Sequence, residues 1–450
     1  MPGRASRPGV PYGEQPVTSR LDQFLTGSPW RQYVYGYPHK TAYRAFAEPR
    51  PLEAVWANER PDTRFLYVHV PFCELRCGFC NLFTTANPAD DVVERFLAQL
   101  LVEAKETAAV VGTRRYTRAA IGGGTPTYLS AGQLERLLGV LREVMGFGAA
   151  PLSVELSPAT LTREKLAVLS VATRLSLGVQ SFVEPELASL RRPQATRDVL
   201  GALELIREHS RAHLNIDLIY GMEGQTPASL VGSLEAALRW RPEELYLYPL
   251  YVRPLTFLGK HAAWDDHRLT LYRVARDWLG SRGYRQRSLR VFVRADVGEV
   301  ELPEYHAEDD GMVGLGVGAR SYTKALHYAH DFAVAPGAVR SIIDDYLARP
   351  AASFQVARSG FELDVAEQQR RWVLLSLLGP GSDGGAFASR FGVPLLEALP
   401  QLRQLVSEEL AAWQGETLAL TPRGLEWSDA LGPWLFSSEV EARMSAWEAR

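Results

Sequence analysis

The residues with the clearest chemical potential are three cysteines in one short stretch. Cys73, Cys77 and Cys80 are the only cysteines of the 450-residue chain, and the stretch that holds them reads CELRCGFC. Three thiolates at positions i, i+4 and i+7 of a loop that contains a glycine can converge on one centre. Cysteines that only filled the core would be scattered along the chain. The spacing therefore predicts a metal site in this loop.

The number of sulfur ligands narrows the kind of metal. A structural zinc ion takes four ligands, usually in two separated pairs, and a second pair of cysteines is missing. His69 precedes Cys73 by four positions and could complete a zinc site, although it falls in a predicted strand. A disulfide uses only two cysteines and rarely persists in a reducing compartment. The remaining option is a [4Fe-4S] cluster on three cysteines, which leaves one iron open, as catalytic metal centres do.

The elements that must position these cysteines follow a regular alternation. From Phe65 onward, six short apolar segments alternate with segments whose apolar residues recur at helical spacing. This order predicts parallel strands with crossover helices, hence an α/β protein. Six repeats rather than eight predict an open, partial (β/α)6 barrel. The predicted strands are RFLYVHV at 64–70, RAAIGGG at 118–124, LSVEL at 152–156, RLSLGVQSF at 174–182, HLNIDLIYG at 213–221 and EELYLYPL at 243–250.

Polar and otherwise special residues cluster at the end of every predicted strand. In barrels and open α/β sheets the active site lies at the carboxyl ends of the strands. We therefore expect these residues to line one site. In chain order they are the cysteine loop, then Gly122, Gly123, Gly124 and Thr125, then Glu155 and Ser157, then Gln180, Asp217, Tyr248 and Tyr251.

The flanking segments divide the chain into three predicted parts. Residues 1–60 form a polar leader and an aromatic arm, QYVYGYPHKTAYR at 32–44, that wraps the main domain. Residues 61–330 form the barrel and its extension, in which GLGVGARSY at 314–322 predicts a tight glycine turn on the rim. Residues 351–450 are mostly helical, and LALTPRGLEWSDALGPWLF within them predicts a small wing after a helix, as in winged-helix domains.

Composition excludes several classes of function. The net charge of −3 provides no general basic surface, so we expect no nucleic-acid partner. The chain contains no run of about 18 apolar residues, so we expect no membrane span. The polar N-terminus also lacks the apolar stretch of a secretory signal. An odd number of closely spaced cysteines indicates a reducing compartment, the cytoplasm. We expect a monomer.

The cysteine spacing and five further motifs resemble one family. C-x3-C-x2-C after the first strand of an α/β barrel is similar to the radical SAM superfamily. The order of the motifs resembles its oxygen-independent coproporphyrinogen III oxidase-like branch, which includes haem chaperones and class C radical methyltransferases. The motifs are YVHVPFCELRCGFCN, IGGGTPTYLS, VELSP, LGVQSF, NIDLIYGMEGQTP and GLGVGARSY.

The resemblance implies a cofactor and a chemistry. The open iron would bind S-adenosylmethionine (SAM), and one electron from a donor such as flavodoxin or ferredoxin would release a 5′-deoxyadenosyl radical that abstracts hydrogen from a small-molecule substrate. The resemblance places the first SAM beside Gly123, Gly124 and Glu155, with Tyr67 and Phe79 flanking the cluster. It places a possible second SAM beside Phe79, Gly124, Thr125, Gln180, Arg192, Asp217 and Tyr251.

Departures from the family patterns keep three functions open. Leu82 stands where the oxidases carry a fourth cysteine, and YHAEDDGMVG, with His306 alone, replaces the H-N-x-x-Y-W stretch of the haem chaperones. The aromatic arm resembles the arm that covers the substrate in the oxidases. The first hypothesis is an oxidase-like enzyme acting on a porphyrinogen-like or other organic substrate. The alternatives are a class C methyltransferase and a haem carrier.

Overall fold

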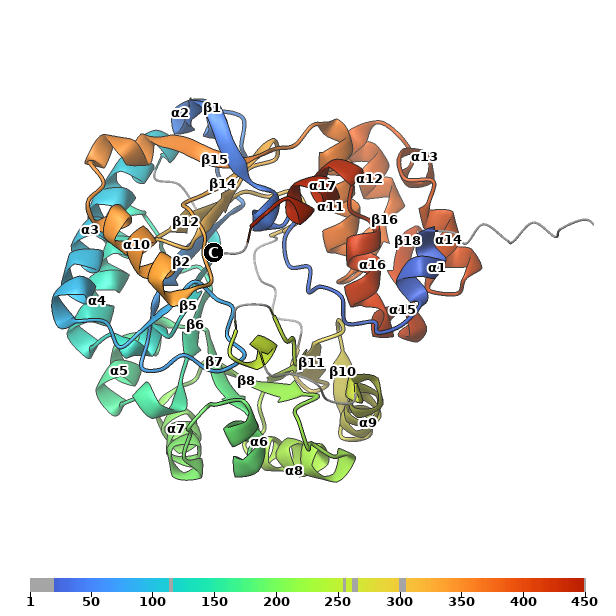
Figure 1. The fold of residues 1–450 in the computed structure, drawn as a ribbon, viewed down its shortest axis with the longest axis horizontal. Helices are drawn as coiled ribbons and strands as arrows, with labels where there is room; N and C mark the ends of the chain where they lie inside the picture. Colours follow the sequence, from blue (N-terminus) through green and yellow to red (C-terminus); the bar gives the residue numbers. More distant parts are fainter. Residues whose placement is uncertain (1–19, 113–115, 254–255, 261–265, 299–304, 449–450) are drawn as a thin grey trace, which may run out of the picture.

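The computed structural model describes residues 20–112, 116–253, 256–260, 266–298 and 305–448. Its centre is six parallel strands that neighbour one another in chain order, and these confirm the predicted partial α/β barrel. Figure 1 shows them fanning out from β2 through β5, β6 and β7 to β8. The six strands are β2 (Arg64–Val70), β5 (Tyr116–Gly123), β6 (Leu152–Leu156), β7 (Arg174–Gln180), β8 (His213–Tyr220) and β9 (Glu244–Pro249).

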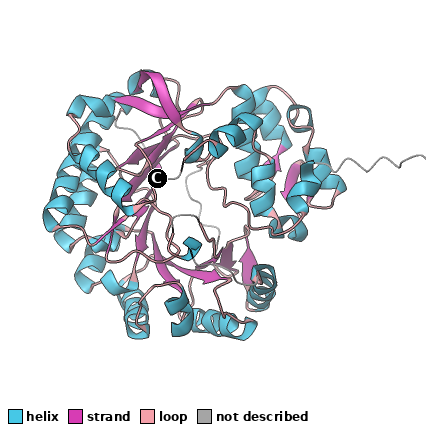
Figure 2. Ribbon diagram, in the orientation of Figure 1, coloured by secondary structure: helices cyan, strands magenta, loops and turns pink. Residues whose placement is uncertain are grey.

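Helices cover the outer face of this sheet, and Figure 2 shows the strands on the inside. Successive strand residues point to opposite faces, so Leu152, Val154 and Leu156 of β6 are buried on the helix side while Ser153 and Glu155 face the barrel interior. Capping boxes begin two of the helices, at Ser130 and Thr226. The helices are α3 (Asp90–Val111), α4 (Ala131–Gly139), which continues as a π-helical turn (Val140–Val144), α5 (Arg163–Val168), α6 (Glu184–Ser189), α7 (Thr196–His209) and α8 (Pro227–Leu238).

The sheet extends beyond the six strands on both sides, which the sequence did not predict. Antiparallel β11 (Val291–Arg294) and β10 (Tyr284–Gln286) follow β9, after helix α9 (Arg268–Ser281). On the other side β12 (Met312–Leu315) pairs in parallel with β2. Beyond β12 the order is β13 (Arg320–Tyr322), β14 (Leu326–Ala329), β15 (Val356–Glu362) and β1 (Arg44–Pro51), with α2 (Leu52–Trp56) after β1 and α10 (Pro336–Leu347) before β15.

The predicted glycine turn on the rim is present between β12 and β13. A Cβ on Gly316 would lie 2.5 Å from the His69 carbonyl oxygen, and a Cβ on Gly318 would lie 2.9 Å from the His69 ring. Both glycines have positive φ angles, +87° and +99°. Close approach and backbone conformation therefore both require glycine where this turn packs on the end of β2.

A second hydrophobic core lies beside the barrel. It joins residues of the arm, among them Leu21, Val34 and Tyr37, to the helices after β15. In Figure 1 these helices lie across the open side of the barrel. They are α1 (Arg20–Leu25) from the arm, then α11 (Val365–Leu377), α12 (Gly384–Phe391), α13 (Leu395–Ala398), α14 (Leu402–Ser407), α15 (Pro422–Glu426), α16 (Ser428–Trp434) and α17 (Ser438–Ser445).

A hairpin lies where the wing was predicted. β17 (Ala411–Gln414) and β18 (Thr417–Leu420) pair with each other, and β16 (Ser382–Asp383) pairs with β18. The winged-helix assignment and the boundary at residue 351 stay predictions, and β15 belongs to the main sheet. The leader, residues 1–19, lies outside the described residues. No helix in the described part is long and apolar enough to span a bilayer.

Candidate functional site

The three cysteines lie at the carboxyl end of β2, as predicted, around the short strands β3 (Phe72–Cys73) and β4 (Thr85–Ala86). Backbone hydrogen bonds hold the loop: the Gly78 N–H donates to the Leu190 carbonyl at 2.8 Å, and the Cys80 N–H donates to the Cys77 carbonyl at 3.1 Å. A Cβ on Gly78 would lie 2.9 Å from the Leu190 oxygen. Glycine therefore lets the loop sit against the segment after α6.

The environment of the thiols opposes their ionisation. Burial raises the pKa of the Cys80 thiol to about 12 and also raises the pKa of Cys73, and the charges of the cysteines act on one another. Two hydroxyls, from Thr84 and Thr125, lie 3.1 Å and 3.5 Å from the Cys73 sulfur and partly offset this effect. A cationic centre bound to these thiols would stabilise their thiolate form and release the thiol protons.

The donor set fits an iron–sulfur cluster better than zinc. All three cysteines are free and half-buried. In the described part of the chain, no group of three His, Cys, Asp or Glu side chains is arranged to hold a metal ion, and this includes the three cysteines. The proposed fourth zinc ligand, His69, is already engaged: its Nε2 lies 2.8 Å from the Phe83 carbonyl and its Nδ1 3.3 Å from the Tyr67 hydroxyl. Burial lowers the pKa of His69 to about 4, so the ring is neutral.

The glycine turn after β5 packs against protein. A Cβ on Gly124 would lie 2.5 Å from the Phe72 carbonyl oxygen, and a Cβ on Gly123 would lie 2.7 Å from the His69 ring. The backbone N–H of Gly124 donates to Val70 and that of Thr125 to Phe72, both at 2.7 Å. The close approach that we expected for a ligand is therefore made by the cysteine loop itself. Contact of this turn with SAM stays a prediction.

Glu155 presents a carboxylate to the barrel interior. Its side chain is accessible to solvent, although nearby protein atoms still desolvate the carboxyl group. Its Oε2 accepts a hydrogen bond from the Gly123 N–H at 3.0 Å. Desolvation, with repulsion from Asp217, raises the pKa of Glu155 to about 7. Glu155 therefore changes its protonation near neutral pH, and its contact with SAM stays a prediction.

Two further predicted residues lie on neighbouring strands. Gln180 ends β7 at a φ of +69°, and the pairing with β8 shifts register there, which marks a strained bulge that re-aims the side chain. Asp217 lies within β8 rather than after it and accepts hydrogen bonds from Asn215 at 2.8 Å and Ser176 at 3.0 Å. Burial raises the pKa of Asp217.

Arg192 contacts the cysteine loop and the end of β7. Its Nη1 donates to the Cys77 sulfur at 3.2 Å, and its Nη2 donates to the Gly178 carbonyl at 2.7 Å. Of the two aromatics expected to flank the cluster, Tyr67 lies on β2 with its hydroxyl beside His69. Phe79 packs in a small apolar cluster with Leu190, Ile219, Met222 and Leu250.

Tyr251 is bound to the C-terminal helices, which the sequence did not indicate. Its hydroxyl donates to Asp429 at the start of α16, and the same carboxylate pairs with Arg290 at 2.5 Å. The Arg290 guanidinium also stacks 3.8 Å from the centre of the Tyr33 ring. The residue predicted to touch a second SAM is therefore engaged in a buried contact between barrel, arm and C-terminal helices.

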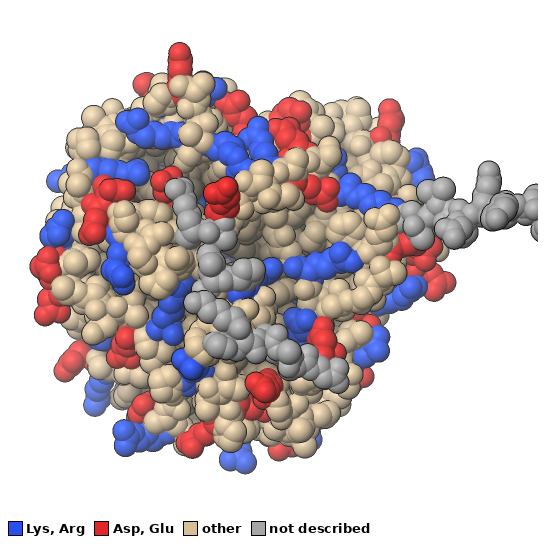
Figure 3. Space-filling view, in the orientation of Figure 1, with Lys and Arg blue, Asp and Glu red and all other residues tan. Residues whose placement is uncertain are grey.

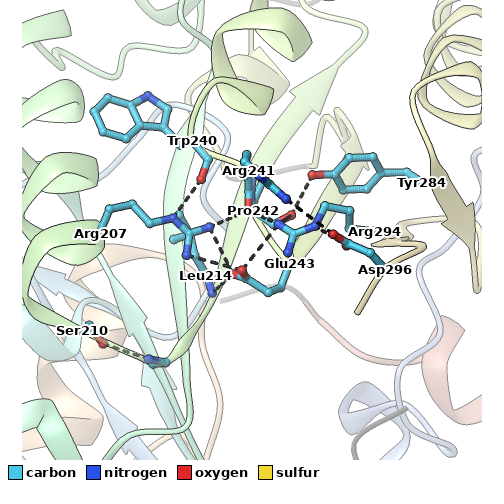
Figure 4. A network of polar contacts seen from close by, with 11 residues as sticks. Arg207, Ser210, Leu214, Trp240, Arg241, Pro242, Glu243, Tyr284, Arg294 and Asp296 are labelled. Atoms are coloured by element: carbon cyan, nitrogen blue, oxygen red, sulfur yellow. Dashed lines mark hydrogen bonds and ion pairs between the residues drawn. The ribbon is translucent and has the colours of Figure 1, made fainter. Parts of the chain in front are cut away.

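One described pocket lies elsewhere, at the amino ends of β8 and β9. Its volume is about 490 Å³, and Arg207, Arg294 and His213 line it. Figure 4 shows that both arginines turn toward Glu243, at 3.1 Å and 3.5 Å. Residues at this end of such barrels generally serve stability. The charges of Arg207 and Arg294 are also paired with that of Glu243. We assign no function to this pocket.

Comparison with known proteins gives two kinds of relatives. The family model for the radical SAM superfamily matches residues 67–237. The heme chaperone HemW of Bacillus subtilis is 28% identical over 380 residues, which cover 80% of this chain and 95% of the chaperone. The HemW of Mycobacterium tuberculosis is 33% identical over 288 residues, which cover 60% of this chain and 73% of that protein.

The second kind of relative is an enzyme. The oxygen-independent coproporphyrinogen III oxidase of Escherichia coli is 30% identical over 283 residues, which cover 59% of this chain and 62% of the oxidase, less than two thirds of its length. The solved structure of that oxidase matches with a TM-score of 0.75 and 23% identity, over 90% of this chain and 96% of the oxidase chain. The fold is therefore shared along almost the whole chain.

Proposed function

This chain belongs to the radical SAM superfamily, in the branch related to the oxygen-independent coproporphyrinogen III oxidases, and we propose that it is an enzyme that cleaves SAM at a [4Fe-4S] cluster. The observation that carries the proposal is the cysteine loop: three free thiols interact electrostatically at the carboxyl end of β2. Cys73, Cys77 and Cys80 would hold the cluster, which would supply the electron for reductive cleavage of SAM and so the radical chemistry of the reaction.

The chain's own residues would hold and orient the cofactors. Cys73, Cys77 and Cys80 would ligate three irons, and Arg192, already 3.2 Å from the Cys77 sulfur, would stabilise its thiolate form. Glu155, fixed by the Gly123 N–H, would accept a hydrogen bond from SAM. The predicted contacts of Tyr67, Phe79, Gln180, Asp217 and Tyr251 with one or two SAM molecules belong to the same proposal.

The interior of the barrel supports an enclosed organic substrate. Tyr33 of the arm stands 6.3 Å from Tyr248 of β9, ring centre to ring centre, and 5.2 Å from Tyr35. A porphyrinogen-like substrate, oxidatively decarboxylated as in the oxidase, is the reaction that we propose first. This reaction would take place in a reducing compartment and would need a one-electron donor such as flavodoxin or ferredoxin.

Haem carriage is the second candidate, since two HemW proteins are among the relatives. The structure offers an argument against it. His306 lies at the amino end of β2, where Tyr305 stacks on Phe65 at 5.2 Å, and the cysteines lie at the other end of that strand. The His306 Nδ1 is also 3.2 Å from a Glu308 carboxylate oxygen. We therefore favour the enzyme.

Anaerobic product analysis tests the choice. Reconstituted protein with dithionite and SAM should form 5′-deoxyadenosine, and with coproporphyrinogen III it should form tripropionate and divinyl products. S-adenosylhomocysteine appearing alongside 5′-deoxyadenosine would indicate a methyltransferase instead. Stoichiometric haem binding without SAM turnover would contradict the proposal and indicate a carrier.

A further inference from the structure

Arg192 lies in the turn between α6 and α7, against the cysteine loop. The resemblance placed this arginine beside a possible second SAM, but its contacts in the structure are with the loop and the sheet. Nη1 of the guanidinium donates to the Cys77 sulfur at 3.2 Å, and Nη2 donates to the Gly178 carbonyl at 2.7 Å. Arginine stays charged at every ordinary pH. A permanent positive charge is therefore in contact with one of the three expected cluster ligands.

Further hydrogen bonds fix the guanidinium in this position. Nε of Arg192 donates to the Gln194 side-chain oxygen at 3.1 Å, and the Gln194 amide nitrogen donates to the Val179 carbonyl at 2.9 Å. The backbone N–H of Arg192 donates to the Leu187 carbonyl at 3.0 Å. All three guanidinium nitrogens are thus engaged, two of them with atoms that hold the side chain against the end of β7. The charge is positioned at the sulfur before any cofactor binds.

The three cysteine sulfurs have different neighbours. The Cys73 sulfur lies 3.1 Å and 3.5 Å from the hydroxyls of Thr84 and Thr125, which are neutral, whereas the Cys77 sulfur accepts from a cation. Burial raises the pKa of the Cys73 thiol, and the charge of Arg192 is among the groups that partly offset this effect. Arg192 therefore acts on two of the three ligands, on Cys77 by contact and on Cys73 through space.

The charges on the surface do not provide the same effect. Figure 3 shows Lys and Arg side chains interspersed with Asp and Glu on the face that it draws, and the net charge of the chain is −3. Water and salt screen exposed charges. Arg192 is half-buried and touches the sulfur, so its interaction is short and weakly screened. Local contact, rather than a general field, distinguishes this arginine.

Hydrogen bonds to the ligand sulfurs and nearby charges set the reduction potential of an iron–sulfur cluster. Reduction adds one electron, and hence one negative charge, while no bond forms or breaks. A cation at a ligand sulfur stabilises the reduced form more than the oxidised form. We propose that Arg192, acting through Cys77, raises the reduction potential of the cluster and so makes it easier for the electron donor to reduce. The inference rests on the proposed function and adds a positioning residue that regulates its first step.

The test measures the midpoint potential of the anaerobically reconstituted protein in the absence of SAM. Dithionite is the reductant, and electron paramagnetic resonance measures the reduced cluster. Arg192→Gln removes the charge. At a fixed potential we expect its ratio of reduced to oxidised cluster to fall about tenfold, a shift of about 59 mV to lower potential for a one-electron couple. Arg192→Lys keeps the charge and should retain most of the original potential. Gln194→Ala removes one brace and should give a smaller shift in the same direction.

Arg197→Gln is the matched control. It removes the same charge from the first turn of α7, where the side chain is 87% exposed and lies 3.4 Å from an Asp198 carboxylate oxygen. The potential should be unchanged in this variant, because solvent screens the charge. Iron and sulfide content and thermal unfolding are measured for every variant. A role limited to bracing the loop would lower the cluster content of Arg192→Gln without changing the potential of the cluster that remains, and this result would contradict the inference.

Two further results would overturn the inference. One is an equal shift in Arg192→Gln and Arg197→Gln. The other is weaker SAM binding by Arg192→Gln, measured by equilibrium dialysis, with an unchanged potential, which would assign the guanidinium to SAM. If Arg192→Gln holds no cluster, an unchanged potential in Gln194→Ala decides against the inference. Unaltered protein without iron and sulfide would contradict the proposed function itself, whereas a cluster whose potential is independent of Arg192 would contradict this inference alone.

Discussion

At the scale of single residues, desolvation in the barrel interior raises the pKa values of carboxyl groups. Glu155 lies on β6 and Asp217 on β8, with β7 between them, and each carboxyl has a raised pKa because protein replaces water around it. The Gly123 N–H donates to Glu155 and limits the shift. Acids with raised pKa values are common in ligand sites.

Glu155 should make stability depend on pH. Its pKa in the folded protein is about 7, above the ordinary value of 4.5, so the folded state favours the protonated form. The contribution of Glu155 to stability is therefore full below about pH 4.5 and is lost as the pH rises through 7. We expect Glu155→Gln to raise the melting temperature relative to the unaltered protein at pH 8 and to change it little at pH 5.

A control separates this effect from general charge removal. Glu235→Gln, at an exposed carboxylate of α8, should give the same small difference at both pH values. If Glu155→Gln shows no pH-dependent gain, the carboxylate does not lie in a desolvating environment. Differential scanning fluorimetry across this pH range makes the comparison.

At the scale of elements, the cysteine loop and the turn after β5 are fitted to each other. Gly124 lies against the Phe72 backbone, and the N–H groups of Gly124 and Thr125 donate to the ends of the loop segment. The Glu103 carboxylate of α3 accepts from the Gly316 N–H at 2.7 Å and from the Tyr346 hydroxyl at 2.8 Å, which anchors the second glycine turn. The cysteine loop is therefore held by two turns, the one after β5 and the one between β12 and β13.

Gly124→Ala should loosen this fit. The added Cβ would meet a backbone carbonyl oxygen at 2.5 Å, which cannot move away as a side chain could. We expect a loss of about 1–3 kcal/mol in unfolding free energy and a lower iron content after reconstitution. Urea denaturation and iron analysis provide the measurements.

Gly132→Ala in α4 is the matched control, because no atom lies within 4 Å of the Cβ it would add. It should be neutral or slightly stabilising, since alanine favours a helix. Equal behaviour of the two variants would mean that the turn does not support the loop.

The elements that the sequence predicted well are those with a strong local pattern. LSVEL coincides with β6, and the helix expected at 196–209 coincides with α7, because continuous apolar strands and helical spacing are local signals. The pairing of β12 with β2 was missed, because β12 is short, contains Gly314 and joins a strand far away in the chain. The position of the three cysteines in one loop at the carboxyl end of β2 was predictable from their spacing and from the strand pattern. The contact between Tyr251 and Asp429 was not predictable, because it depends on tertiary packing.

At the scale of the whole molecule, the arm and the C-terminal helices join at the barrel rim. Arg290 and Asp429 form an almost completely buried ion pair, with side chains 7% and 3% exposed. Tyr251 donates to the same carboxylate, and Tyr33 of the arm stacks on Arg290. One buried polar contact therefore ties three parts of the chain together above the barrel interior.

Asp429→Ala should weaken this junction. It leaves the Arg290 charge buried without its carboxylate, and such a change costs about 3–5 kcal/mol. Glu441→Ala removes the partner of Arg20 in an exposed pair, with side chains 39% and 46% exposed, and should cost about 1 kcal/mol or less. Urea denaturation compares the two. Similar small losses of unfolding free energy in the two variants would show that the Arg290–Asp429 pair does not join the barrel, the arm and the C-terminal helices.

The central claim is that Cys73, Cys77 and Cys80 hold a four-iron cluster. The most direct measurement is the iron, zinc and acid-labile sulfide content of oxygen-free protein, for the unaltered chain and for Cys77→Ser. We expect about four irons and four sulfides per chain, with brown absorbance that the serine variant loses together with SAM cleavage. About one zinc and no sulfide in the unaltered protein, or a serine variant that keeps its absorbance and SAM cleavage, would contradict the account.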